Sequence, residues 1–262
     1  MSLRTGLGGG KLTGMSSTDI DSPGPPRRHI AVLAFPDVEP VDAVGPIDIF
    51  ASAGSDWDGR ASRAYATELL APEAGPVKSF TGLSLVADRA FAEVDPGELD
   101  TLIVAGGPGV WAAVHDAALI DWLAAAQGRV RRLCSVCSGA FLLAAAGLLD
   151  GRRATTHWRW CGELARRHPA VTVEPDLIWV RDGDIYTSAG VTAGMDLALA
   201  LVEEDLGRAA AMAVARAKVM FLKRPGGQSQ YSMALRAQSA AEPPLQALQD
   251  WIRDNLGRPL RC

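Results

Sequence analysis

The chain has 262 residues, of which 48% are hydrophobic and 21% charged, and its formal net charge is −4. These values are ordinary for a soluble globular protein with one large domain or two modest ones. The acidic balance excludes the basic electrostatic footprint of a nucleic-acid-binding chain, so any DNA-binding function must come from outside these residues.

The cysteine content and the N-terminal residues bear on the cellular compartment. A chain with four cysteines has too few for a disulfide scaffold, which favours a reduced, cytoplasmic protein. Residues 1–27 are rich in Gly, Ser and Pro and lack the apolar core of a signal peptide, so a disordered leader or tag is expected, with Met15 as a candidate natural start. The longest apolar run, residues 140–149, is too short to span a bilayer.

The first half of the chain alternates predicted strands and helices. The apolar run at 29–35 is typical of a strand buried on both faces, as in a parallel sheet. A loop is expected over 36–46. Further strands are expected at 66–70 and 100–105, and helices at 47–53 and 116–127.

The same alternation continues in the second half. Strands are expected at 132–137, 170–180 and 185–187, and helices at 139–149, 194–206 and 209–222. Strands alternating with helices predict an α/β fold with a doubly wound, mostly parallel sheet, that is, a flavodoxin-like sandwich.

A second boundary lies near the C-terminus. Residues 228–244 are polar and read as a linker that follows an α/β domain over 28–227. Residues 245–256 then have helical apolar spacing, around Trp251. One amphipathic helix with nothing to pack on predicts that 245–262 begins another domain, which continues beyond this sequence.

The chemistry concentrates at Cys137, in the segment Ser-Val-Cys-Ser-Gly over 135–139. A nucleophile between a strand and a helix, with small neighbours, is typical of a nucleophile elbow at the carboxyl edge of a sheet. The helix dipole and unsatisfied N–H groups there predict a lowered thiol pKa. The N–H groups of Ser138 and Gly107 are candidates for binding an oxyanion, and Gly106 lies at the same edge.

Other interpretations of these cysteines are weighed beside this one. Cys137 alone has even odds of being a buried structural residue. Cys134 and Cys137 also form a C-x-x-C pair, but residues three apart on a strand point to opposite faces and no second pair completes a zinc site. Cys134 is therefore expected in the core, and neither a metal nor a cofactor is expected.

Two further residues are candidate partners of the thiol. His157 follows the elbow helix and could return towards Cys137 as a base, although a lone loop histidine is more often structural. Asp42 follows the first strand. It reads either as a helix N-cap or as a carboxyl with a raised pKa that hydrogen-bonds the thiol.

Five separated motifs resemble the PfpI/ThiJ, or class I glutamine-amidotransferase-like, superfamily, in the order of that family. They are PDVEPVDAVGP at 36–46, VAGGPG at 104–109, VCSG at 136–139, ATTHW at 154–158 and TSAGVTAGMD at 187–196. The resemblance implies that Asp42 approaches Cys137, and that Ser188, Gly190 and Thr192 lie near a ligand in the same pocket.

The segment RPGGQSQYS at 224–232 resembles the one that follows the sensor domain in AraC-family transcription regulators of this fold. Residues 245–260 resemble the first helix of their DNA-binding domain. This resemblance implies a truncated regulator, cut off where its helix-turn-helix domain begins.

Ser138 stands where protease-like and glyoxalase-like members carry a histidine, which weakens those functions, while isocyanide hydratases carry a small residue there. The sequence favours a dimeric sensor domain that binds a small, nitrogen-containing metabolite over Cys137. The alternative is a stand-alone hydratase with Cys137, Asp42 and His157 as catalytic residues; a deglycase or amidase is a weaker option. A homodimer is expected, with Trp57, Trp111 and Trp122 as candidate contact residues, and with DNA bound only by the missing domain.

Overall fold

The computed structural model describes residues 27–54, 64–224, 227–228 and 243–255. The expected leader (except Arg27), Met15, Trp57 and most of the expected linker over 228–244 lie outside the described residues. So does the end of the expected C-terminal domain, residues 256–262.

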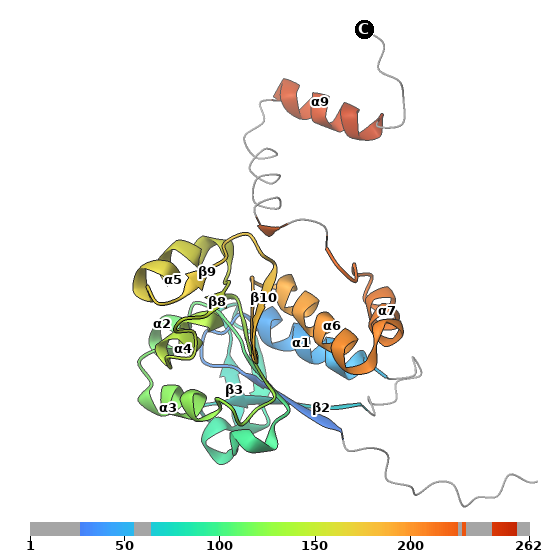
Figure 1. Ribbon diagram of the computed structural model, residues 1–262. Coiled ribbons are helices and arrows are strands. Elements are labelled where there is room, and N and C mark those ends of the chain that lie inside the picture. Colours follow the sequence, from blue (N-terminus) through green and yellow to red (C-terminus); the bar gives the residue numbers. More distant parts are fainter. Residues whose placement is uncertain (1–26, 55–63, 225–226, 229–242, 256–262) are drawn as a thin grey trace, which may run out of the picture.

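Seven strands form one sheet in the order β10-β11-β7-β6-β1-β2-β5 (Figure 1). All neighbouring strands are parallel except the pair β10 and β11, which is antiparallel. Their bounds are β1 Arg28–Leu33, β2 Tyr65–Ala71, β5 Arg89–Ala90, β6 Thr101–Val104, β7 Arg132–Val136, β10 Trp179–Asp182 and β11 Ile185–Ser188. The predicted α/β fold with a mostly parallel sheet is confirmed.

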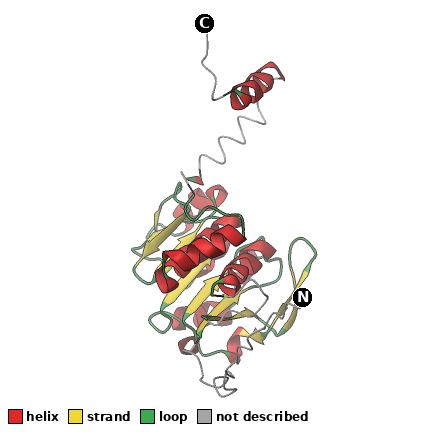
Figure 2. Cartoon of the chain, turned by 90° about the vertical axis from the view of Figure 1, so that its right-hand side faces the viewer, coloured by secondary structure: helices red, strands yellow, loops and turns green. Residues whose placement is uncertain are grey.

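Helices cover both faces of this sheet. Helices α1 (Pro40–Ser52), α6 (Thr192–Leu206) and α7 (Arg208–Ala217) pack on one face, and Figure 2 views the molecule from that side. Helices α2 (Val110–Ala113), α3 (Ala117–Ala125), α4 (Ala140–Ala145) and α5 (Cys161–Arg167) cover the other face. Two apolar cores result, one on each side, because every central strand is buried on both faces.

Helix α1 begins earlier than the sequence indicated, inside the segment predicted as a loop over 36–46. Glu39 is its N-cap, with a side chain that accepts a hydrogen bond from Val41 N (3.3 Å), and Pro40 takes the first helical position. Pro46 lies inside the helix. Asp42 therefore sits in the first turn of a helix rather than in a loop, and it is not the N-cap.

Other boundaries differ for local reasons. The expected strand over 170–180 is two strands in different sheets, β9 (Thr172–Val173) and β10, with Pro175 between them. The expected helices at 139–149 and 209–222 end at Ala145 and Ala217, because Gly147 (φ 74°) and Val219 (φ 55°) adopt left-handed conformations just beyond.

Short elements complete the body. The hairpin of β3 (Gly75–Lys78) and β4 (Ser84–Ala87) stands beside the main sheet, and β8 (Arg153–Ala154) pairs with β9. The 3₁₀ turns are η1 Phe91–Glu93, η2 Pro96–Glu98, η3 Cys137–Gly139 and η4 Trp158–Trp160. The sequence analysis did not predict the hairpin, α2 or α5.

Helix α9 (Pro243–Asp254) lies apart from the α/β body in both views (Figures 1 and 2). Its Leu248, Trp251 and Ile252 side chains are 46 to 51% exposed. Within the described residues, no helix is long and apolar enough to cross a membrane.

Two of the tryptophans expected at a dimer contact are half-buried within this chain. Trp122 packs against Phe91 and donates from Nε1 to Val94 O at 2.9 Å. Trp111 packs edge-on against Phe141. Because the body absorbs much of both rings, they are weak support for a dimer contact, and the homodimer stays a prediction.

Candidate functional site

Cys137 occupies the turn between β7 and α4, at the carboxyl edge of the sheet. Its φ of 54° is in the left-handed region, which costs a non-glycine residue energy and marks a strained turn. Two hydrogen bonds hold it there: Cys137 N donates to Ala189 O (3.2 Å), and Thr156 Oγ1 donates to Cys137 O (2.6 Å). The predicted strand–cysteine–helix elbow is confirmed. Cys134, two residues before the end of β7, is fully buried in the core as expected.

Asp42 lies fully buried beneath the thiol. Its Oδ2 accepts a hydrogen bond from Gly106 N (3.1 Å) and its Oδ1 accepts one from Val191 N (2.9 Å). Its side chain also shares a hydrogen bond with the side chain of Cys137. Burial raises the pKa of Asp42 to about 7 despite these donors, so the carboxyl is about half protonated at neutral pH.

The predicted lowering of the Cys137 pKa is wrong. Burial raises the pKa of the thiol above its usual value, and the neighbouring Asp42 carboxylate raises it further. The hydrogen bond from Ser138 N favours the thiolate but is too weak to reverse these effects. The helix dipole contributes little because the chain enters a three-residue 3₁₀ turn here and the regular helix α4 has only six residues.

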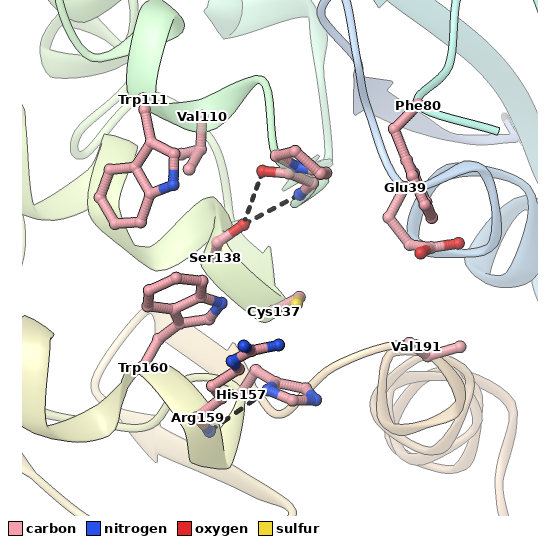
Figure 3. Close-up of a pocket in the computed structure, with 12 residues that line it drawn as sticks. Glu39, Phe80, Val110, Trp111, Cys137, Ser138, His157, Arg159, Trp160 and Val191 are labelled. Atoms are coloured by element: carbon pink, nitrogen blue, oxygen red, sulfur yellow. Dashed lines mark hydrogen bonds between the residues drawn. The ribbon is translucent and has the colours of Figure 1, made fainter. Parts of the chain in front are cut away.

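Gly106 and Gly107 follow β6 and lie against the elbow. A Cβ on Gly106 would lie 2.8 Å from both Asp42 Oδ2 and Cys137 Cβ, so only glycine allows this approach. The Gly107 N–H donates to Ser138 Oγ (2.9 Å), which in turn donates to Gly107 O (3.1 Å) (Figure 3). The Gly107 N–H is therefore occupied and does not serve as an oxyanion donor in this arrangement. The Ser138 N–H faces the sulfur of Cys137.

His157 lies on the other side of the thiol, next to Gly190. A Cβ on Gly190 would lie 2.4 Å from His157 Cδ2 and 3.0 Å from Cys137 Sγ. The His157 Nδ1 accepts a hydrogen bond from Arg159 N (3.3 Å), and no described hydrogen bond joins the imidazole to Cys137. Burial lowers the pKa of His157, and Arg159 adds to this, so the ring is neutral. The structure thus brings His157 near Cys137 but pairs the thiol with Asp42.

Two residues implied by the resemblance, Ser188 and Thr192, do not line the pocket that contains Cys137. Ser188 is fully buried and donates to Ser135 O (3.3 Å) in the sheet. Thr192 is exposed and lines a neighbouring cavity of about 250 Å³, together with Gly190 and Gln228.

A pocket of about 270 Å³ opens above Cys137 (Figure 3). Gly107, Ser138 and His157, three of the candidate site residues, line it. Its lining also includes seven residues that the sequence analysis had not placed there: Glu39, Phe80, Pro108, Val110, Arg159, Trp160 and Val191. Trp111, which the sequence analysis proposed as a dimer contact, contributes a further wall. These residues come from several short segments that are far apart in the chain, so their spacing in the sequence has no period that could have identified them.

The fold and this elbow define a class of α/β proteins with a cysteine at the strand-to-helix turn, buried against a carboxyl group. Residues 28–204 match the DJ-1/PfpI family, and the chain belongs to that family.

Named relatives include both enzymes and regulators. An isonitrile hydratase from Pseudomonas putida is 37% identical over 179 residues, which cover 68% of this chain and 72% of that protein. The HTH-type transcriptional regulator CdhR from Pseudomonas aeruginosa is 35% identical over 161 residues, covering 62% of this chain and 47% of the regulator. The chain spans about half the length of the curated regulators it matches.

Among solved structures, a THiJ/PfpI family protein from Pseudomonas syringae is similar to this chain with a TM-score of 0.66 and 30% identity. The similarity covers 82% of this chain and 84% of the other.

Proposed function

We propose that this protein hydrates small isonitriles, with Cys137 as nucleophile and Asp42 as proton carrier. The observation that carries the proposal is the hydrogen bond between the Asp42 carboxyl, whose pKa is about 7, and the Cys137 thiol. A carboxyl of this pKa accepts a proton and returns it with comparable ease at neutral pH. The thiol is mostly protonated at rest, so it needs such a partner when it attacks.

The reaction follows from this pair. Asp42 takes the thiol proton as Cys137 Sγ attacks the terminal carbon of R–N≡C, and the same proton is then delivered to that carbon, which gives R–N=CH–S–Cys137. Water adds to the carbon of this thioimidate, the C–S bond breaks, and the sulfur leaves as a thiol. The products are R–NH–CHO and the regenerated enzyme, so one isonitrile and one water are consumed.

The walls of the pocket suit this substrate. An isonitrile group carries no net charge, and Val110, Trp111 and Trp160 offer its terminal carbon an apolar approach to the sulfur. Apolar walls also exclude bulk water, which strengthens the interaction between Asp42 and the thiol.

The relatives support this reading over the sensor that the sequence alone favoured. The isonitrile hydratase from P. putida shares more of its length with this chain than the regulators do. Ser138 also keeps the residue after the cysteine small, as the sequence analysis noted for this branch.

The test is formation of an N-substituted formamide from a panel of small isonitriles, followed by proton NMR. We expect turnover by the wild type, none by Cys137→Ala and a strong loss in Asp42→Asn. Cys161→Ala is the matched control, because that thiol is buried outside the pair and should leave turnover unchanged. Absence of formamide with folded wild-type protein across the panel would reject the enzyme.

A sensor domain of an AraC-type regulator is the second candidate, and the anchoring of Gln228 favours it. Its Nε2 donates to Thr155 Oγ1 (3.1 Å), Thr156 O (3.1 Å) and Leu177 O (2.9 Å), and its backbone N donates to Asp176 O (2.7 Å). Thr156 also holds the carbonyl of Cys137. One contact chain therefore joins the elbow to the segment that leads towards α9.

In this second candidate, a small nitrogen-containing ligand over Cys137 changes the position of the C-terminal segment, the chain pairs as a homodimer, and DNA is bound outside the described residues. Hydrogen exchange tests the coupling. Carbamidomethylation of Cys137 should change the exchange rate of the Gln228 amide, and Gln228→Ala should change the alkylation rate of Cys137. Gln127→Ala, on an exposed site, is the control. If neither rate responds, the contact chain carries no signal.

A further inference from the structure

We propose that the pocket takes compact electrophiles that carry an anionic group, such as a carboxylate, and that Arg159 binds this group. The inference rests on the proposed function only in taking Cys137 as the reacting centre, and it adds the class of ligand.

The position of Arg159 is the first observation. It follows His157 by two residues and lines the pocket above the thiol. Its guanidinium carbon lies 5.8 Å from the centre of the Trp160 ring. Figure 3 shows the guanidinium between Trp160 and His157, on the side facing Cys137. Arg159 is exposed, but it lines the same pocket as Cys137, so an anionic group bound to it would share that pocket with the reacting sulfur.

The charge of Arg159 is the second observation. Neighbouring arginines are paired: Arg153 with Glu174 at 2.9 Å, and Arg166 with Glu163 at 2.7 Å. Among the residues that the structure describes, Arg159 has no carboxylate within ion-pair distance. His157 is neutral, so Arg159 is the cationic side chain that lines the pocket.

The pocket wall opposite Arg159 determines the orientation of the ligand. Glu39 lines the pocket across the thiol from Arg159 (Figure 3). Its carboxylate would repel an anionic group and attract a donor or cationic group. A ligand with one anionic end is therefore placed in a single orientation, with that end at Arg159 and its reactive carbon over Cys137. Arginine is suited to this task because its planar N–H groups match a carboxylate in bidentate fashion.

The size of the pocket limits the ligand. A volume of about 270 Å³ is small for a ligand site, and the edge-to-face pair of Trp111 and Trp160, with ring centres 5.2 Å apart, forms one wall. The body between the two ends of the ligand is thus short and apolar. Isocyanoacetate is the simplest isonitrile with these properties.

The test compares two alkylating probes of nearly equal size, iodoacetate and iodoacetamide. With either probe the Cys137 S–C bond forms, the C–I bond breaks, iodide leaves and the thiol proton passes to solvent. Rates are measured at Cys137 by mass spectrometry of the digested protein. Arg159→Met should slow the reaction with iodoacetate about three- to fivefold, the upper part of the usual range for one charge contact near a surface, and change the reaction with iodoacetamide by less than about twofold.

The matched control is Arg166→Gln, which removes a cation outside the pocket and should change neither rate. An equal loss with both probes would overturn the proposal by showing that Arg159 only shapes the site. If Arg159→Met leaves the ratio of the iodoacetate rate to the iodoacetamide rate unchanged, the proposal is overturned, because the charge of Arg159 then does not act on the probe in the pocket.

A second measurement uses turnover. Isocyanoacetate should have a lower KM than its neutral methyl ester, and Arg159→Met should raise the KM for isocyanoacetate with little change in kcat. Because the alkylation ratio needs no turnover, the two hypotheses fail separately. If Arg159→Met lowers the ratio of the iodoacetate rate to the iodoacetamide rate but the wild type hydrates no isonitrile, the enzyme is rejected and the anion preference stands. If Arg159→Met leaves this ratio unchanged, only the anion preference is rejected.

Discussion

The Asp42 carboxyl and the Cys137 thiol share a hydrogen bond although they come from a helix after β1 and a turn after β7. Burial raises the pKa of both groups. The Asp42 carboxylate raises the pKa of the thiol further, whereas the hydrogen bond from the thiol lowers the pKa of the carboxyl. The pair therefore holds a proton near neutral pH, and this relationship leads to the first two predictions.

The alkylation rate of Cys137 should have a pH midpoint above the value of a free thiol, near 8.5. Burial and the Asp42 carboxylate both raise the pKa of this thiol. Asp42→Asn removes the negative charge and should shift the midpoint to lower pH. Iodoacetamide labelling across a pH series, read at the Cys137 peptide, measures both midpoints. A wild-type midpoint below 8.5 contradicts the environment described above.

The stability of the protein should contain a contribution from Asp42 that falls as pH rises. The pKa of Asp42 is about 7 in the folded protein against 3.8 for the unperturbed group, so the folded state holds an extra proton between these values. The contribution is complete below about pH 4 and is lost by about pH 7. Within this window each pH unit costs at most about 1.4 kcal/mol.

Urea unfolding of wild type and Asp42→Asn at several pH values isolates this contribution. The difference in the free energy of unfolding between the two proteins should shrink steadily from pH 4 to pH 7. A difference that is constant with pH would mean that Asp42 titrates normally in the folded state.

Gly190→Ala should strongly reduce the reactivity of Cys137 with little effect on the rest of the fold. The new Cβ would lie 2.4 Å from His157 Cδ2 and 3.0 Å from Cys137 Sγ, so the ring or the elbow must move. We expect alkylation to slow about tenfold or more, because displacements of this size disturb reactive geometry. Gly162→Ala is the control, since no atom lies within 4 Å of its Cβ position. Similar rates for the two variants would contradict the packing.

Ser138→Ala should destabilise the protein by about 1–3 kcal/mol, because it leaves the buried Gly107 N–H without its partner. The exposed Ser84 provides the control, and Ser84→Ala should change stability by less than about 0.5 kcal/mol. Chemical denaturation of both variants gives the comparison. Equal stabilities would mean that water replaces the lost hydroxyl.

Local pattern was sufficient for the fold class and for the elbow. The apolar run that contains β1 and the small residues around Cys137 are local signals, each carried by a few consecutive residues. A strand that is apolar on both faces is typical of a parallel sheet covered by helices on both sides. The helix boundaries were less predictable. The start of α1 depends on the cap at Glu39, and Pro46 inside that helix obscured it.

The sequence by itself determined which residues gather at the carboxyl edge of the sheet, because parallel strands bring their ends to one side. Only the tertiary structure decided how they pair. Whether the thiol meets Asp42 or His157 depends on distances of a few ångströms between segments far apart in the chain. The direction of the Cys137 pKa likewise depends on burial that no local motif records. The sequence analysis could not place Arg159 and the aromatic walls in the site for the same reason. Contacts between segments far apart in the chain leave no period in a sequence.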